Sequence, residues 1–324
     1  MLQIAPFARA FARVVKRRWK YGPRRPSWSL PVELALDVFK ERLMQAPHMD
    51  PIQFRQEQDA FAASVPSRAL KKLTRRPERL GGVDGEWLVP PGASGDSALI
   101  YLHGGAYVMG SVSTHGDLMA MLALQSGVQV FAVNYRLAPE HPYPAAIDDA
   151  EAVYEALLAK GMAPRRLVVG GDSAGGGLSL ALLLRLRAAK RPMPGGALLI
   201  SPWVDLTSAS ASVDTNAVYD FGDRKLLDYW VGIYRGSAPA SDPLISPLFA
   251  ELHGLPPLCV FAGEVEMLSD QIRALVEKAQ AAGVEVDYVC APDLAHVYLM
   301  LHLISRPAAD AIEHAARFIK KRTS

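Results

Sequence analysis

The sequence predicts an α/β fold with a mainly parallel sheet. From about residue 83 to the C-terminus, short aliphatic runs typical of buried strands alternate with longer segments of helical spacing. At residues 167–186 one such run, Leu-Val-Val, passes through a glycine-rich turn into an almost uninterrupted apolar helix. A central parallel strand followed by a buried helix has this pattern.

Composition limits the class of protein. The 324 residues, 50% of them hydrophobic, suffice for one large domain, or a domain with an accessory piece, around a sizeable core. The net charge of +2 comes from well-mixed charges, so nucleic acid is not an expected partner. Cys259 and Cys290 fall in expected strands, where we expect buried free thiols and no disulfide framework. No run reaches the roughly 18 apolar residues of a membrane span, and the N-terminus lacks the apolar core of a signal peptide, so we expect a cytoplasmic protein.

Residues 2–20 predict an amphipathic helix that ends in a basic cluster. We expect it to dock on the protein body, and a membrane-surface anchor is the less favoured alternative. A linker with three prolines follows at residues 21–31, then a second helix at 32–45 and a polar stretch at 51–76. The apolar positions of the first helix are Leu2, Ile4, Phe7, Phe11, Val14, Val15 and Trp19.

Strand and helix signals then alternate along the rest of the chain. The first strand signal begins near residue 82 and covers 83–89. Further strands are expected at residues 98–102, 128–135, up to 169, 197–201, 258–262 and 284–290. Helices are expected at 117–125, 144–159, 178–186, 269–282 and 308–320, with an irregular, partly helical insertion at 202–243.

The turn after the strand ending at residue 169 contains the pattern G-x-S-x-G, with Ser173 at its centre. Gly171 and Gly175 let the backbone turn sharply, which exposes the serine hydroxyl as a nucleophile. A dinucleotide-binding G-x-G-x-x-G beginning at Gly175 would need glycine at position 180, where the chain has Leu180. The strand before the turn and the helix after it therefore favour a nucleophilic serine.

A serine nucleophile needs a histidine base. In an α/β-hydrolase the order is serine, acid, histidine, so the base follows the last strands. Of the eight histidines, this order leaves His296 and, less favoured, His302. His296 lies in a loop at residues 292–296, just after the last expected strand, and is therefore the predicted base.

The base needs an acid that orients it. The segment at residues 263–270 follows the strand at 258–262 and offers three carboxylates, Glu264, Glu266 and Asp270. Asp270 opens the next helix, where a carboxylate caps the helix or interacts with its dipole. We therefore expect Glu266 to be the acid, with Asp270 as its main competitor.

An oxyanion hole is expected in the run His-Gly-Gly at residues 103–105, directly after a strand. Gly104 and Gly105 allow a carbonyl oxygen to approach the backbone, and the N–H of Ala174 completes the hole. His103 is expected to support this loop by hydrogen bonding. Neither H-x-x-H nor H-E-x-x-H occurs, so we expect neither a catalytic metal nor another cofactor.

Several motifs in the same order resemble those of the bacterial hormone-sensitive-lipase family of carboxylesterases. They are H-G-G-A-Y at 103–107, N-Y-R-L-A-P-E at 134–140 and G-D-S-A-G-G at 171–176, and the runs D-P at 242–243, S-P-L at 246–248 and 263–270 agree. The resemblance covers about residue 80 to the C-terminus. Two positions depart from it, because Glu266 stands where many members have aspartate and Val297 where the family often has glycine.

The resemblance implies an α/β-hydrolase fold with an eight-stranded, mostly parallel sheet, helices on both faces and a helical cap. We expect residues 1–50 as an N-terminal cap segment, 202–243 as a cap insertion, and 51–201 with 244–324 as the catalytic domain. The expected substrate pocket is lined by residues that flank the motifs or lie in the insertion: Tyr107, Trp203, Tyr219, Phe221, Val297 and Tyr298.

The expected function is that of a serine carboxylesterase, which hydrolyses small esters with short-to-medium acyl chains through an acyl-enzyme. Two alternatives remain open at this stage. One is hydrolysis of lactones, amides or drug esters with the same triad, and the other is a non-catalytic small-molecule receptor of the same fold. The presence of His296 argues against the receptor. The expected partner is a small-molecule ester, and a homo-oligomer is possible.

Overall fold

A computed structural model describes residues 4–324, with side chains from residue 8 onward. One eight-stranded sheet forms the centre of the molecule, in the order β1-β2-β4-β3-β5-β6-β7-β8. Only the β1–β2 and β2–β4 pairs are antiparallel, which confirms the expected mostly parallel sheet. The strands are β1 (Thr74–Leu80), β2 (Val83–Val89), β3 (Ala98–Leu102), β4 (Gln129–Val133), β5 (Leu167–Asp172), β6 (Gly196–Ile200), β7 (Leu258–Gly263) and β8 (Val286–Ala291).

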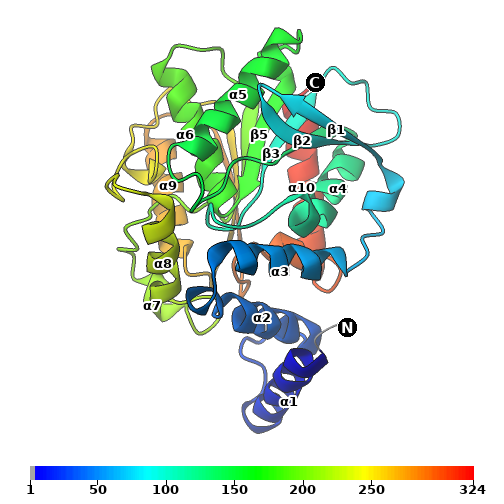
Figure 1. Ribbon diagram of the computed structural model, residues 1–324, viewed down its shortest axis with the longest axis vertical. Coiled ribbons are helices and arrows are strands. Elements are labelled where there is room, and N and C mark those ends of the chain that lie inside the picture. Colours follow the sequence, from blue (N-terminus) through cyan, green and yellow to red (C-terminus); the bar gives the residue numbers. More distant parts are fainter. Residues whose placement is uncertain (1–3) are drawn as a thin grey trace.

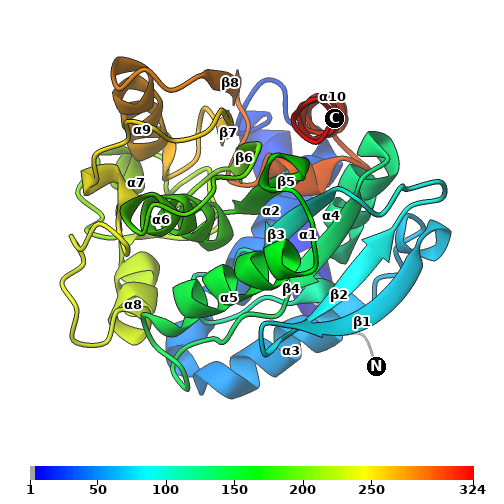
Figure 2. The ribbon, with the colours of Figure 1, turned by 90° about the horizontal axis from the view of Figure 1, so that it is seen from above.

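Helices cover both faces of this sheet, as Figure 2 shows from above. One face carries α4 (Val112–Ser126) and α10 (Arg306–Arg322), which pack on each other. The other carries α5 (Ala145–Ala159), α6 (Ala174–Ala188) and α9 (Ser269–Ala281). The central strands β3 to β7 are fully buried. Their aliphatic side chains point alternately to the two faces of the sheet and belong to a separate apolar cluster on each face. Short 3₁₀ turns lie at Ala46–His48, Leu70–Lys72, Pro164–Arg166, Pro247–Phe249 and Tyr298–Leu301.

The remaining helices lie at one end of the molecule, in the lower part of Figure 1. They are α1 (Ile4–Tyr21), α2 (Leu30–Leu43) and α3 (Pro51–Ala63) from the N-terminal segment, and α7 (Ser212–Thr215) and α8 (Arg224–Tyr234) from the insertion. The two groups touch, because the rings of Phe54 in α3 and Trp230 in α8 have centroids 5.9 Å apart. Helix α1 lies outermost and packs on α2.

The first predicted helix is present, although Leu2 and the side chains of Ile4 and Phe7 lie outside the described residues. None of the helices described between residues 4 and 324 combines the length and apolarity needed to cross a membrane.

Two elements that begin in the polar stretch at 51–76 were missed by the sequence analysis. Helix α3 begins with Asp50, whose side chain accepts hydrogen bonds from the N–H groups of Ile52 and Gln53. Strand β1 has the sequence Thr-Arg-Arg-Pro-Glu-Arg-Leu and is exposed along most of its length. An edge strand of this kind has no hydrophobic alternation, because charges and proline protect its free edge.

The prediction that both cysteines are buried is wrong for Cys290. Both thiols are free, but Cys259 is buried in β7 whereas Cys290 is exposed. The reason is position, since Cys290 lies on β8, the strand at the edge of the sheet, and β8 is only partly covered. A single-sequence pattern does not separate an edge strand from a central one when both are aliphatic.

Candidate active site

Ser173 lies in a sharp turn between β5 and α6, as the sequence predicted. Its backbone angles are φ 53° and ψ −120°, a conformation that L-residues rarely adopt. A Cβ atom at either Gly171 or Gly175 would overlap the carbonyl oxygen of Leu102, so only glycine fits on both sides of the serine. The N–H of Ser173 donates to the carbonyl of Ile200 at 2.8 Å. The turn is therefore held rigidly, with a partly exposed serine at its tip.

Asp172, the residue before the serine, is a functional residue that the sequence analysis missed. Its buried carboxylate accepts hydrogen bonds from the Tyr101 hydroxyl at 2.7 Å and the Gly104 N–H at 3.1 Å. His115 Nε2, from α4, lies 3.2 Å from its other oxygen. Burial opposes the charge of Asp172, but His115 and the Tyr101 hydroxyl outweigh it and lower the pKa of the carboxyl. The only signal in the sequence was the acid inside the serine motif.

The oxyanion loop follows β3. The Gly104 N–H already donates to Asp172, so the expectation that it faces a substrate is corrected. Gly105 has φ 118°, and a Cβ there would overlap the carbonyl oxygen of Met109. Among the described residues, the N–H groups of Gly105, Ala106 and Ala174 have no protein acceptor. Gly105 and Ala174 are the two of these that the sequence assigned to the oxyanion hole.

His103 supports the oxyanion loop from within the protein. Its Nδ1 lies 2.8 Å from the carbonyl oxygen of Gly104, and its ring stacks on Tyr135 with centroids 4.4 Å apart. Burial, reinforced by the nearby charge of His115, lowers the pKa of His103 to about 3. The ring is therefore neutral and donates to the Gly104 carbonyl, which fixes the loop's shape.

His296 and Glu266 lie together at the ends of β8 and β7. His296 Nδ1 is 2.8 Å from Glu266 Oε2, and both side chains are buried. The other oxygen of Glu266 accepts the Gly263 N–H at 3.2 Å. Burial disfavours the imidazolium, but the hydrogen bond and charge of Glu266 outweigh it and raise the pKa of His296. Burial in turn raises the pKa of Glu266, against the effect of His296.

The end of β6 ties the serine and the histidine to one backbone segment. Ile200 accepts the Ser173 N–H, and the next residue, Ser201, accepts the Val297 N–H through its hydroxyl at 3.0 Å. Val297 itself has φ 48°, in the left-handed region that favours glycine and that a β-branched residue rarely adopts. No hydrogen bond joins Ser173 to His296 within the described chain. Such bonds are often long before substrate binds and shorten in the complex.

The competing candidates have other partners. The Asp270 carboxylate accepts the Ser212 N–H at 2.8 Å and pairs with Arg273. It makes no capping hydrogen bond to α9, but it lies in the first turn of that helix, where it can interact with the helix dipole. Glu264 accepts the Asp293 N–H at 2.9 Å. His302 Nε2 lies 3.0 Å from Asp117 on α4. Of these residues, none pairs with His296.

Aromatic residues surround the histidine and the oxyanion loop. The Phe221 ring lies 5.2 Å from that of His296, measured between centroids. The Tyr107 ring stacks on that of Tyr234, with centroids 3.7 Å apart. The backbone N–H of Trp203 donates to the carbonyl of Ser173 at 2.9 Å. Tyr219 packs edge-on against Trp28 of the N-terminal segment. The other two expected pocket residues, Val297 and Tyr298, are buried in the cluster that includes α10.

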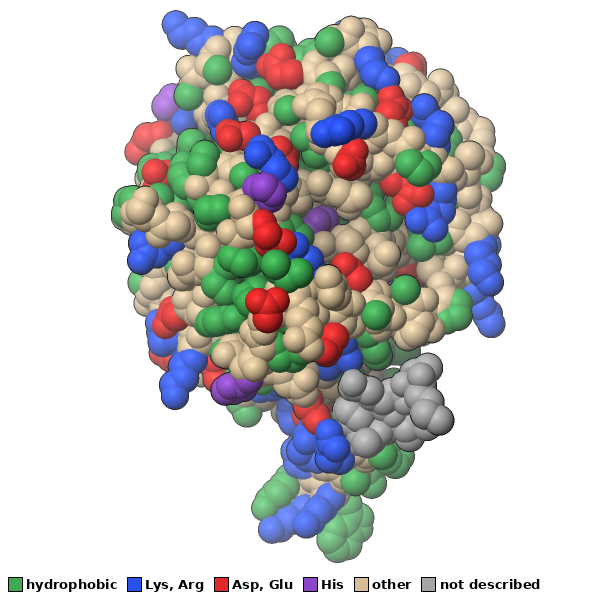
Figure 3. All heavy atoms as spheres, viewed as in Figure 1, with side chains coloured by type: hydrophobic (Ala, Val, Ile, Leu, Met, Phe, Trp, Pro, Cys, Tyr) green, Lys and Arg blue, Asp and Glu red, His purple; other side chains and the backbone are tan. Residues whose placement is uncertain are grey.

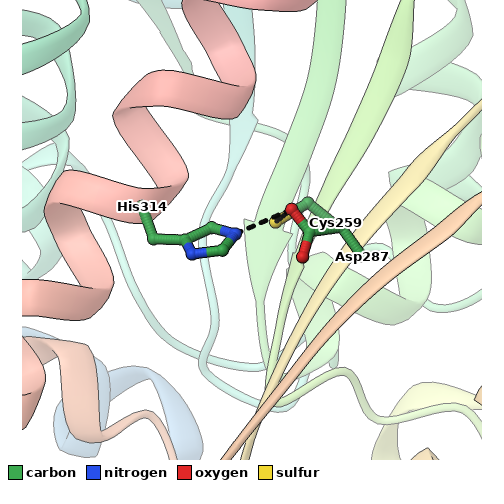
Figure 4. A group of neighbouring side chains, drawn as sticks. All are labelled: Cys259, Asp287 and His314. Atoms are coloured by element: carbon green, nitrogen blue, oxygen red, sulfur yellow. Dashed lines mark hydrogen bonds and ion pairs between the residues drawn. The ribbon is translucent and has the colours of Figure 1, made fainter.

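One cluster has metal-ligand chemistry. Cys259, Asp287 and His314 bring a thiol, a carboxylate and an imidazole within 4.8 Å of one another (Figure 4). His314 Nε2 pairs with Asp287 at 2.7 Å, and burial raises the pKa of the Cys259 thiol, which disfavours the thiolate that a metal needs. The cluster involves the first halves of β7 and β8, whereas Glu266 and His296 follow the last residues of these strands. It is therefore separate from the candidate active site.

Comparisons with known proteins agree with this geometry. A family model described as an alpha/beta hydrolase fold matches residues 99–300. An acetyl-hydrolase of Streptomyces hygroscopicus is 39% identical over 245 residues, which are 75% of this chain and 82% of that protein. The carboxylesterase NlhH of Mycobacterium tuberculosis is 31% identical over 316 residues, 92% of this chain and 97% of NlhH.

A crystal structure of an esterase from the bacterial hormone-sensitive lipase family aligns over the full length of both chains, with TM-score 0.82 and 33% identity. The chain belongs to this family. It is a carboxylic ester hydrolase of the α/β-hydrolase fold, as the motifs at 103–107 and 171–176 indicated.

Proposed function

We propose that Ser173, His296 and Glu266 hydrolyse small carboxylic esters through an acyl-enzyme. The serine turn and the 2.8 Å contact between His296 Nδ1 and Glu266 support this assignment. With Nδ1 bonded to the acid, Nε2 is the nitrogen that takes the proton from Ser173 Oγ as this oxygen attacks the ester carbonyl. The N–H groups of Gly105 and Ala174 then stabilise the oxyanion.

The second half of the reaction uses the same groups. His296 gives its proton to the leaving alcohol, and the acyl group stays on Ser173. Water then attacks the acyl carbonyl while His296 takes a proton from it, and collapse of the oxyanion returns the proton to Ser173 and releases the carboxylic acid. The alcohol leaves with the proton of Ser173 and the serine regains a proton from water, so the cycle balances without a cofactor.

We propose short-to-medium acyl chains as substrates. The similarity to an acetyl-hydrolase supports a small acyl group, and the aromatic rings of Tyr107 and Phe221 beside the site favour an apolar one. The proposed cap consists of residues 1–50 and 202–243, over a catalytic domain at 51–201 and 244–324. Because Phe54 packs on Trp230, we extend the N-terminal part of the cap to the end of α3.

The test is a series of p-nitrophenyl esters from acetate to dodecanoate, hydrolysed by the wild type and by Ser173→Ala. We expect the highest kcat/KM at short-to-medium chains and a loss in kcat on the order of 10⁶ for the variant. Ser94→Ala, an exposed loop serine, is the matched control and should behave as wild type. Hydrolysis by Ser173→Ala near the wild-type rate would reject the proposed nucleophile.

A further inference from the structure

Helix α1 has one face that the protein itself covers. Ala10 and Val14 are buried against α2. On the same side, Arg13 donates to Asp37 at 2.8 Å and Arg17 to Glu33 at 2.5 Å. These contacts fix the orientation of α1 on α2, so the opposite face of α1 points away from the body.

That opposite face is apolar. Phe11, Val15 and Trp19 are spaced four residues apart, so they form one stripe along the helix. Their exposed fractions are 45%, 39% and 89%, and Tyr21 at the end of the helix is 70% exposed. Most large apolar side chains of this protein are buried, so the three exposed ones of this stripe form a patch that needs a partner.

The charges beside this stripe are all positive. Residues 4–21 contain six Lys or Arg residues and no Asp or Glu. Lys16 and Lys20 are exposed, and within the described chain neither has a carboxylate partner. In Figure 3, the lowest part of the molecule, where Figure 1 places α1, shows hydrophobic and basic side chains next to each other.

We propose that α1 is an interfacial helix that seats this enzyme on an anionic lipid surface. Phe11, Val15 and Trp19 would enter the boundary between headgroups and acyl chains, while Lys16 and Lys20 would lie among the acidic headgroups. A second copy of this chain is a poorer occupant, because two such basic stripes repel each other. The position of α1 at the end of the molecule allows it to reach a flat surface without obstruction by the body.

The experiment is sedimentation of the full-length protein with two kinds of vesicle. The neutral vesicles contain phosphatidylcholine alone, and the anionic ones contain about one third phosphatidylglycerol. We expect binding to the anionic vesicles and much weaker binding to the neutral ones. Lys16→Gln with Lys20→Gln should weaken binding roughly 25-fold, from about fivefold for each lysine. Phe11→Ser with Val15→Ser should abolish it. Leu303→Ser, an exposed leucine outside α1, is the matched control and should bind as wild type.

Tryptophan fluorescence reports the same event at one residue. Of the five tryptophans, Trp28, Trp87, Trp203 and Trp230 are buried and only Trp19 is exposed. Anionic vesicles should therefore shift the emission of the wild type to shorter wavelength. Trp19→Phe should still sediment with the vesicles but show no shift, which assigns the shift to Trp19.

Three outcomes would overturn the proposal. The protein could stay in the supernatant with both vesicles, or the lysine and apolar double variants could bind as tightly as the wild type. The third is a dimer in light scattering that Phe11→Ser with Val15→Ser dissociates, without vesicle binding, which would assign the stripe to a second copy. Ester hydrolysis in solution is measured separately, so failure of this proposal leaves the catalytic one standing.

Discussion

At the scale of single residues, Asp172 connects the nucleophile turn to the oxyanion loop. Its carboxylate accepts hydrogen bonds from Tyr101 and Gly104 and lies beside His115, so three elements meet at one buried charge. The sequence analysis expected the Gly104 N–H to bind the oxyanion, but this group donates to Asp172 and fixes the oxyanion loop in place. Asp172 therefore acts as a positioning residue for the neighbouring donor, Gly105.

Asp172→Asn should lower both activity and stability. The neutral amide is a weaker acceptor and places an N–H₂ group opposite existing donors, at a cost of roughly 2–3 kcal/mol in the free energy of unfolding. We expect kcat to fall about 10- to 100-fold with little change in KM, because the oxyanion loop acts on the transition state. Steady-state kinetics and urea unfolding measure both effects. Tyr101→Phe removes one donor to Asp172 and should lower kcat and stability less than Asp172→Asn does. An Asp172→Asn enzyme with wild-type kcat would contradict the positioning role of Asp172.

Glu266→Gln should cost roughly 10⁴ in kcat, because the base loses the anion that orients it and stabilises its charged form. The glutamine has nearly the same size, so the melting temperature should change little. Glu264→Gln is the matched control and should retain kcat. Asp270→Asn should keep kcat and lose about 1 kcal/mol of stability, since it only weakens the acceptor for Ser212. An inactive Asp270→Asn enzyme beside an active Glu266→Gln enzyme would transfer the acid role to Asp270.

The pH profile tests the same pair through the base. Glu266 raises the pKa of His296, and only neutral His296 can accept the serine proton. The activity kcat/KM should therefore rise with pH through a pKa above 6.5, the usual value for histidine. In Glu266→Gln only the weaker charges of Asp220 and Asp172 still oppose the effect of burial on the pKa of His296, so the acid limb of the residual activity should move to lower pH. If the acid limb of the kcat/KM profile stays at the same pH in Glu266→Gln, the charge of Glu266 does not set the pKa of His296.

At the scale of elements, α2 supports the site through one aromatic contact. The Phe39 ring lies 6.4 Å from that of Phe221, which in turn packs on His296. Phe39→Ala should let Phe221 move and widen the space beside the histidine. We expect the ratio of kcat/KM for octanoate to that for acetate to change several-fold, with kcat for acetate nearly unchanged. Ile52→Ala, a half-exposed residue on α3, is the control. If this ratio is unchanged in Phe39→Ala, α2 has no influence on which acyl chain the enzyme prefers.

Elements differ in how far the sequence predicts them. The bounds of β3 were predicted because all five of its residues are buried and aliphatic or aromatic. Strand β1 was missed because its charges suit an exposed edge. For the site, Ser173, Glu266 and His296 followed from motif order, and the chain brings the acid and base together. Asp172 and the use of the Gly104 N–H were not predictable, because they depend on which buried groups meet in three dimensions.

At the scale of the whole molecule, the N-terminal segment divides into two parts with different contacts. Helix α1 packs on α2, whereas Arg25 and Trp28 contact Asp293 in the loop that carries His296. Deleting residues 1–22 should therefore keep kcat/KM for a short ester within about twofold of the wild type. It should also remove vesicle binding, if α1 is the anchor.

Deletion through residue 45 supplies the contrast, since it also removes Phe39 and the contacts to Asp293. This shorter protein should show an altered acyl-chain preference in the p-nitrophenyl series, provided that circular dichroism shows it folded. If the 1–22 deletion alone changes the preference, α1 takes part in substrate binding and the division between the two parts is wrong.

The most direct measurement of the catalytic account is labelling with a fluorophosphonate, which reacts with activated serines, followed by intact-mass and peptide mass spectrometry. The account predicts one adduct per chain, on Ser173, with no adduct in Ser173→Ala and much slower labelling in His296→Ala and Glu266→Gln. An adduct on another serine, or labelling of Ser173 at the wild-type rate without His296, would contradict it.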